Sequence, residues 1–218
     1  MKKLKKILLI YEKNNKTGFG HYKRLSYLNN YLKKRFITSI KELKKSQKRD
    51  YLNNDIVIFD LNKYDPIFFK KNKLFNKSVT FDNFKNHVSK LNINIFEQNK
   101  KLKGIRYSSL KYVILPKKLK KFKIYPNEKD FFFISLGSRD TKNFLPKVVV
   151  KLKRKNYLFK IGSLIKKKIF LKNYVSQKNF YNEFANSSIC IVNAGVTLTE
   201  GLFMNKLCIV LPQSNRER

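Results

Sequence analysis

The sequence predicts an α/β protein built from two parallel-sheet domains. Short continuous apolar runs, such as 7–11 and 131–136, are typical of strands that are buried on both faces of a sheet. Segments with helical spacing of leucines, as over 25–32, alternate with these runs, and this alternation predicts parallel sheets. A polar, proline-bearing stretch between residues 115 and 131 predicts a linker that separates two such sheets.

Each domain is predicted to repeat the same strand–helix pattern. In the first domain, 1–125, we expect a strand at 7–11, a helix over 25–32, and strands at 56–60, 78–82, 93–96 and 112–115. In the second domain, 130–218, we expect strands at 131–136, 156–161, 188–192 and 207–212, and helices at 142–152, around 180–184 and at 197–204. Two such units predict two Rossmann-like domains that face each other across a cleft.

Composition bounds the class of protein. A hydrophobic content of 42% is enough for a packed core, so the chain is not expected to be disordered. The net charge of +36 suggests nucleic acid or an anionic membrane as a partner. However, 42 lysines and 8 arginines are spread over the whole chain, and the enriched residue types have A/T-rich codons. We therefore favour compositional drift over specific nucleic-acid binding, and expect weak, non-specific anion binding at low salt.

Several site types find no support in the sequence. The two cysteines, Cys190 and Cys208, lie in apolar segments and indicate reduced core residues, with a disulfide as the less favoured alternative. Two cysteines and two scattered histidines give no zinc spacing. No apolar run approaches the length of a membrane span, and the basic start lacks the features of a signal peptide. We expect a cytoplasmic protein without a metal or cofactor.

Three loops between a strand and a helix are the candidate binding segments. The first is 18–24, which carries His21, a side chain suited to accept a proton near neutral pH. The second is 137–140 and the third is 194–200. Loops of this kind bind phosphates at the carboxyl edge of parallel sheets, although a simple turn explains the second loop equally well.

These three segments together resemble the nucleotide-sugar hydrolases of pseudaminic acid biosynthesis. The motifs are Gly-x-Gly-His-x-x-Arg at 18–24, Ser-x-Gly-x-x-Asp at 135–140 and Ala-Gly-x-Thr-x-x-Glu at 194–200. These enzymes release UDP from UDP-2,4-diacetamido-2,4,6-trideoxy-β-L-altropyranose. They are similar to spore-coat polysaccharide proteins and, more distantly, to the peptidoglycan N-acetylglucosaminyltransferase, and have a GT-B fold. The resemblance extends from about Lys6 to Pro212.

The resemblance implies a role for each matching residue. His21 matches the histidine that activates the attacking water. The residues that match substrate-binding positions are Gly18, Gly20, Arg24, Gly137, Ser138, Gly195, Thr197 and Glu200, and Asp60 and Tyr64 match polar residues after a strand of the first domain. For Arg24, an ion pair on the helix surface or between loops is an equal alternative. Glu200, expected in the first helical turn, would bind a ribose diol or simply favour the helix start. His87 is expected at the surface.

Two features depart from the family. The second domain covers about 90 residues and the chain stops directly after a strand, so we expect a short or truncated domain whose last sheet face is uncovered. Gln213 is out of register with the family glutamine, and Leu136 replaces a small residue. The leading hypothesis is hydrolysis of a UDP-linked diacetamido-trideoxy sugar. The alternatives are a UDP-sugar-dependent glycosyltransferase of the same fold, and an inactive remnant or basic nucleic-acid-binding protein.

Overall fold

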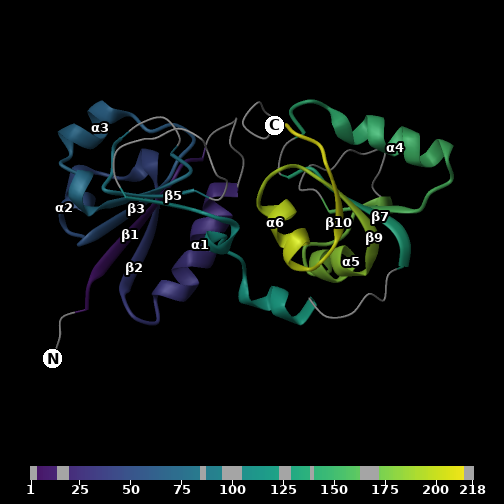
Figure 1. The fold of residues 1–218 in the computed structure, drawn as a ribbon, viewed down its shortest axis with the longest axis horizontal. Helices are drawn as coiled ribbons and strands as arrows, with labels where there is room; N and C mark the ends of the chain where they lie inside the picture. The colour runs from purple at the N-terminus through teal and green to yellow at the C-terminus, as the bar shows by residue number, and fades with distance from the viewer. Residues whose placement is uncertain are drawn as a thin grey trace. The chain divides into compact units, whose positions relative to one another are not determined.

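The computed structural model describes residues 4–13, 20–83, 87–94, 105–122, 129–137, 140–162 and 172–213. The chain divides into two compact units, Met1–Ile114 and Leu115–Arg218. Each unit contains one parallel sheet, and each is described by itself below (Figure 1).

The first unit is a six-stranded sheet with the strand order β2-β1-β3-β4-β5-β6, in which every neighbouring pair is parallel. Its strands are β1 (Lys6–Tyr11), β2 (Ile37–Glu42), β3 (Ile56–Asp60), β4 (Ser78–Phe81), β5 (Leu91–Asn94) and β6 (Ile105–Ser108), and its α-helices are α1 (Gly20–Leu32), α2 (Lys48–Leu52) and α3 (Pro66–Lys71). The chain runs from β1 outward to β2 and returns past β1 to β3. The strand order therefore reverses between β1 and β3, which is where ligands bind in open α/β sheets.

Both faces of this sheet are covered, as the apolar runs predict. Leu25 of α1 packs with Ile7, Leu9 and Ile58 on one face. On the other face, Phe59 packs with aromatic side chains of α2 and α3. Figure 1 shows α1 on one side of the strands and α2 and α3 on the other. Two-sided burial explains why β1 and β3 have continuous rather than alternating apolar residues.

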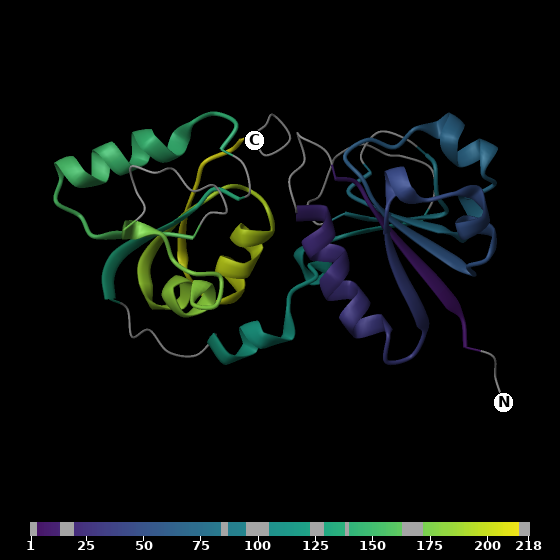
Figure 2. The same ribbon diagram turned by 180° about the vertical axis from the view of Figure 1, so that it is seen from behind.

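The second unit is a four-stranded parallel sheet with the strand order β10-β9-β7-β8. Its elements are β7 (Lys129–Ser135), α4 (Phe144–Arg154), β8 (Phe159–Ile161), α5 (Phe180–Asn186), β9 (Ser187–Val192), α6 (Val196–Phe203) and β10 (Leu207–Val210). Helix α4 covers one face, whereas α5 and α6 cover the other (Figure 2). The order reverses between β7 and β9, so this unit also has a candidate ligand-binding edge.

The predicted pair of parallel α/β sheets is confirmed, but some predicted elements are wrong. Two edge strands, β2 and β6, were not predicted. The strand expected at 112–115 does not form; a 3₁₀ helix, η3 (Leu110–Tyr112), and irregular chain lie there. Within the expected linker, residues 117–122 form the 3₁₀ helix η4 (Lys117–Phe122), whose Leu119 has no exposed surface and belongs to the core beneath α5.

Strand β10 forms one edge of the second sheet and is largely exposed. Leu207 is 65% exposed, Ile209 45% and Val210 36%. Among the described residues, no helix has the length and apolar character needed to cross a bilayer.

Candidate active site

His21 lies at the edge of the first sheet where the strand order reverses. It is the second residue of α1, and its Nδ1 atom lies 2.6 Å from Oδ1 of Asp60, the last residue of β3. Strand β3 pairs directly with β1, so the sheet order brings together two residues that are 39 positions apart. The His21 side chain is 20% exposed, whereas that of Asp60 has no exposed surface. The pair therefore has one buried end and one end that solvent can reach.

Arg24 lies one helical turn after His21 and binds two carboxylates. Its Nε and Nη2 atoms each donate to Asp60 over 2.6 Å, to Oδ2 and Oδ1 respectively. Its Nη1 atom donates to Oδ2 of Asp82, also over 2.6 Å, and its guanidinium lies 5.2 Å from the centre of the Phe81 ring. Arg24 thus forms buried ion pairs that join α1 to Asp60 and Asp82, and an ion pair is one of the two roles considered for it. We call His21, Arg24, Asp60 and Asp82 the charged network.

Electrostatics keep Asp60 and Arg24 ionised. Burial alone would raise the pKa of the Asp60 carboxyl, but the charges and hydrogen bonds of Arg24 and His21 hold that pKa well below its ordinary value. Burial also lowers the pKa of the Arg24 guanidinium, but Asp60 and Asp82 outweigh this effect and leave the pKa above its ordinary value. Asp60 is therefore a carboxylate, which can only accept hydrogen bonds, so His21 Nδ1 is the donor. In the neutral imidazole, this leaves the lone pair on Nε2, where a proton can be taken up.

The hydroxyl of Tyr64 links the ends of two strands at the same edge of the sheet. Its hydroxyl lies 3.1 Å from the carbonyl oxygen of Phe59, accepts from the amide of Leu61 over 3.2 Å, and also bonds to the carbonyl of Phe81. Burial, and then the charge of Asp60, raise the pKa of this hydroxyl well above its ordinary value. Tyr64 is buried, so it joins the ends of β3 and β4 rather than facing solvent.

The first loop is only partly described. Gly18 lies outside the described residues. Gly20 begins α1, and a Cβ atom added there would have no neighbour within 4 Å among the described residues. His87 is exposed and packs edge-on against Phe75, with ring centres 4.9 Å apart.

In the second unit, Asn193 lies beside a glycine of each of the two predicted loops. Gly137, directly after β7, has a φ of +77°, which favours glycine, and its added Cβ would lie 3.5 Å from Asn193 Nδ2. Gly195 precedes α6, and its added Cβ would lie 3.0 Å from the same atom. Asn193 follows the last residue of β9, so it lies at the reversal between β7 and β9. The sequence analysis did not select it, although a polar residue directly after a buried strand is the relevant pattern.

The remaining predicted residues of this unit lie in or near α6 and α4. Thr197 is buried, and Glu200 has no exposed surface and accepts a hydrogen bond over 2.7 Å from the hydroxyl of Tyr181. Glu200 is the fifth residue of α6, so its predicted place in the first turn is wrong. Ser138 lies outside the described residues. Asp140 accepts hydrogen bonds from the amides of Phe144 and Leu145, both over 2.7 Å, and so caps α4.

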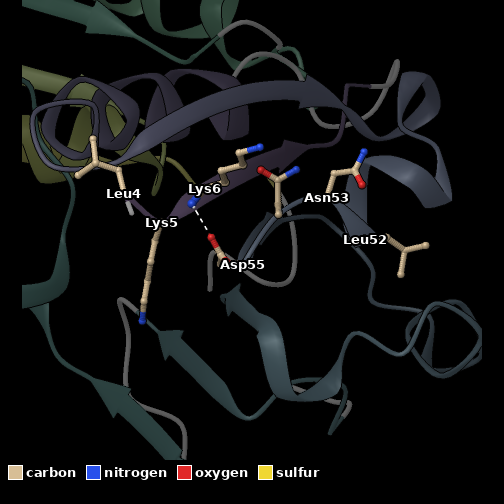
Figure 3. Close-up of a pocket in the computed structure, with 7 residues that line it drawn as sticks. Leu4, Lys5, Lys6, Leu52, Asn53 and Asp55 are labelled. Carbon is tan, nitrogen blue, oxygen red and sulfur yellow. Dashed lines mark hydrogen bonds between the residues drawn. The ribbon is translucent and has the colours of Figure 1, made fainter. Parts of the chain in front are cut away.

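A cavity of about 330 Å³ lies away from these residues (Figure 3). It is lined by Leu4, Lys5, Lys6, Leu52, Asn53, Asn54 and Asp55. Lys6 begins β1 and Asp55 precedes β3, so the cavity lies at the amino ends of the strands. Ligands of open α/β sheets bind at the opposite, carboxyl edge, so the cavity is not the candidate site. Among the described residues, no three His, Cys, Asp or Glu side chains gather closely enough to hold a metal ion.

Comparison with solved structures shows the fold. The chain is similar to UDP-N-acetylglucosamine 2-epimerase from Rickettsia bellii, with a TM-score of 0.57, 11% identity, and coverage of 94% of this chain and 78% of that chain. This likeness confirms the predicted GT-B-like pair of Rossmann-like units. The dimeric Lac repressor with an 11-residue C-terminal deletion aligns with a TM-score of 0.33, 10% identity, and coverage of 95% and 77%. LsrB from Clostridium saccharobutylicum in complex with AI-2 aligns with a TM-score of 0.30, 10% identity, and coverage of 94% and 70%.

No protein-family model matches the chain, and no curated protein matches it.

Proposed function

We propose that the chain acts on a UDP-linked sugar and hydrolyses it, releasing UDP and the free sugar. The observation that carries the proposal is the His21–Asp60 pair at the carboxyl edge of the first sheet, with Nδ1 and Oδ1 2.6 Å apart. A histidine oriented by a buried carboxylate is the usual arrangement of a general base. The likeness in fold to a UDP-N-acetylglucosamine 2-epimerase makes a UDP-sugar the first substrate class to test.

In the proposed reaction, the anomeric carbon of the sugar is attacked by water. His21 Nε2 takes a proton from the water as its oxygen bonds to that carbon, and the bond between carbon and the diphosphate oxygen breaks. Asp60 keeps Nδ1 protonated and stabilises the imidazolium that forms, and Arg24 and Asp82 fix the position of Asp60. Asp60 and Arg24 are therefore positioning residues. Gly18 and Gly20 are proposed to let the backbone approach the sugar phosphate.

The second unit is proposed to bind UDP. The residues assigned to the nucleotide are Gly137, Ser138, Gly195 and Thr197. The amides at the start of α6 favour the negative charge of a departing diphosphate. The same assignment gives Glu200 the ribose. Because its carboxylate is buried against Tyr181, it would contact a ribose only after that hydroxyl moves.

The substrate proposed in detail is a UDP-linked 2,4-diacetamido-trideoxyhexose, as in the family that the motifs resemble. The experiment measures release of UDP from this compound by the wild type, by His21→Ala and by the matched control His87→Ala. We expect release by the wild type and the control, and a loss of about 10²–10⁴-fold in His21→Ala, which is the usual contribution of a general base. Asp60→Asn should lower kcat more than it raises KM, because the asparagine cannot stabilise the imidazolium.

Two outcomes would contradict the proposal. Binding of UDP without its release in water, followed by release when an acceptor sugar is added, would show a transferase. An equal loss of activity in His21→Ala and His87→Ala would show that His21 is not the general base. Gly195→Val tests the second unit separately: it should weaken binding of UDP alone, measured by calorimetry, because the added side chain would meet Asn193.

A further inference from the structure

The two cysteines lie opposite each other on neighbouring strands of the second sheet. Cys190 of β9 and Cys208 of β10 are direct partners in the parallel ladder. Neighbouring strands are about 4.8 Å apart, within the range of about 4.4–6.8 Å between Cα atoms that disulfides span. Both side chains pack on the face covered by α5 and α6, where they are direct neighbours. Both are free thiols, and joining them needs little movement of the backbone.

The surroundings of the two thiols differ. Cys190 has no exposed surface, and its Sγ lies 3.2 Å from the hydroxyl of Ser187. Cys208 is partly exposed on the edge strand. The ammonium group of Lys206, two residues before Cys208, is buried and donates to the carbonyl of Ala185 over 2.9 Å. A partly exposed thiol next to a buried cation is the one that an oxidant meets first.

The ionisation of the pair follows this asymmetry. The hydrogen bond from Cys190 lowers the pKa of the Cys208 thiol, and the charge of Lys206 lowers it further, against the opposing effect of burial. The hydrogen bond to Cys208 and burial raise the pKa of the Cys190 thiol. The two shifts run in opposite directions, so Cys208 loses its proton more readily than Cys190. A partly exposed thiol with a lowered pKa, next to a second thiol, is the arrangement found in redox-sensing sites.

We propose that Cys190 and Cys208 form a dithiol site that hydrogen peroxide oxidises to an intramolecular disulfide, with Cys208 reacting first. The Cys208 thiolate attacks one peroxide oxygen, the O–O bond breaks, and the hydroxide that leaves takes a proton to become water. Cys190 then attacks the sulfur of the resulting sulfenic acid, the S–S bond forms, and the S–O bond breaks to release a second water. The two thiols supply the two electrons that reduce the peroxide.

The disulfide would act on both the edge strand and α6. It would fasten β10, which pairs with one strand only, to the interior strand β9. Helix α6 rests directly on the same sulfur: a Cβ atom added at Gly201 would lie 2.8 Å from Cys208 Sγ. Only a residue without a Cβ atom leaves room for the sulfur at this point of α6, so the helix packs closely against Cys208. Oxidation therefore changes the packing beneath α6 without requiring α6 to unfold.

The experiment treats the full chain with hydrogen peroxide in the presence and absence of dimedone, which labels sulfenic acids, and follows intact mass and peptide maps. The wild type should lose the mass of two hydrogen atoms, regain it with dithiothreitol, and yield one linked peptide pair containing Cys190 and Cys208. Cys190→Ser should accumulate a dimedone adduct on Cys208. Cys208→Ser should react at least tenfold more slowly at Cys190 under the same conditions, because burial protects that thiol.

Three outcomes would overturn the proposal. The first is a wild type that keeps its mass under peroxide concentrations that oxidise free cysteine. The second is a disulfide between two molecules instead of within one. The third is faster labelling of Cys190 in Cys208→Ser than of Cys208 in Cys190→Ser. Cys190→Ala provides the same readout if the serine variant fails to fold, and circular dichroism checks the folding of each variant.

Discussion

Replacing Arg24 with methionine removes the guanidinium that joins Asp60 to Asp82 and so tests how much the charged network stabilises the first unit. Methionine retains most of the length of the side chain and its contact with Phe81, but it donates no hydrogen bond. Three charge-assisted hydrogen bonds of 2.6 Å would be lost. Asp60, which has no exposed surface, would keep its charge with His21 as its remaining partner in the network.

The size of the effect follows from this burial. A hydrogen bond to a charged group contributes about 1.5–3 kcal/mol, and removing one member of a buried ion pair costs about 3–5 kcal/mol because the other charge stays buried. We expect Arg24→Met to lower the free energy of unfolding of the first unit by about 3–5 kcal/mol. Arg24→Lys keeps the charge but not the two-pronged contact with Asp60, so its loss should be intermediate.

The measurement is urea unfolding followed by far-UV circular dichroism. Lys41→Met is the matched control, since Lys41 pairs with Asp50 over 2.7 Å in the same unit, but its side chain is 42% exposed. An exposed pair contributes about 0–1 kcal/mol. Phe184→Ala, a core change in the second unit, identifies the transition that belongs to that unit. A loss in Arg24→Met no larger than that in Lys41→Met would refute the reasoning.

Two further predictions concern pH and glycine. The pKa of Asp60 is lowered in the folded state, so the unfolded state binds more protons near the ordinary Asp pKa of about 3.9, and the free energy of unfolding should fall as the pH drops below that value. Urea unfolding across a pH series should show a smaller fall in Asp60→Asn than in the wild type. An equal fall in the two proteins would contradict this. Gly162→Ala should destabilise the second unit by about 1–3 kcal/mol through overpacking, because the added Cβ would lie 2.2 Å from a ring atom of Phe133. In the part of the chain that the structure describes, the Cβ atom of Gly20→Ala meets no atom within 4 Å, so this change should be neutral or gain up to about 1 kcal/mol. Similar thermal shifts for the two variants would contradict the packing argument.

The interior strands could be predicted from the sequence because burial on both faces requires a continuous apolar run. Edge strand β2 escaped prediction because only two of its six residues, Ile37 and Ile40, are apolar and none of the six is fully buried. The apolar run at 112–115 was wrongly predicted as a strand for a different reason. Ile114 packs on the core of the first unit, and Leu115 packs on the core of the second. An apolar run that divides between two cores has no reason to be a strand.

The candidate site was predictable only where its residues are close in sequence. His21 and Arg24 are one helical turn apart and follow a buried strand, so their segment was selected. Their contacts with Asp60 and Asp82 span 36 to 58 positions and exist because β3 lies between β1 and β4. Periodicity identifies strands but does not give their order, so Asp82 entered the prediction only as the last residue of the strand expected at 78–82. Asn193 was overlooked for the same reason.

The exposed edge strand β10 has a consequence for how the protein behaves in solution. An open edge with apolar side chains invites pairing between copies. A net charge of +36 opposes this, since long-range repulsion keeps the molecules apart. That repulsion weakens once the screening length shrinks to about 10 Å at 0.1 M salt and about 3 Å at 1 M. The positive charge of the many lysines therefore keeps copies of the protein apart. Concentrated salt should screen this repulsion and allow the copies to self-associate.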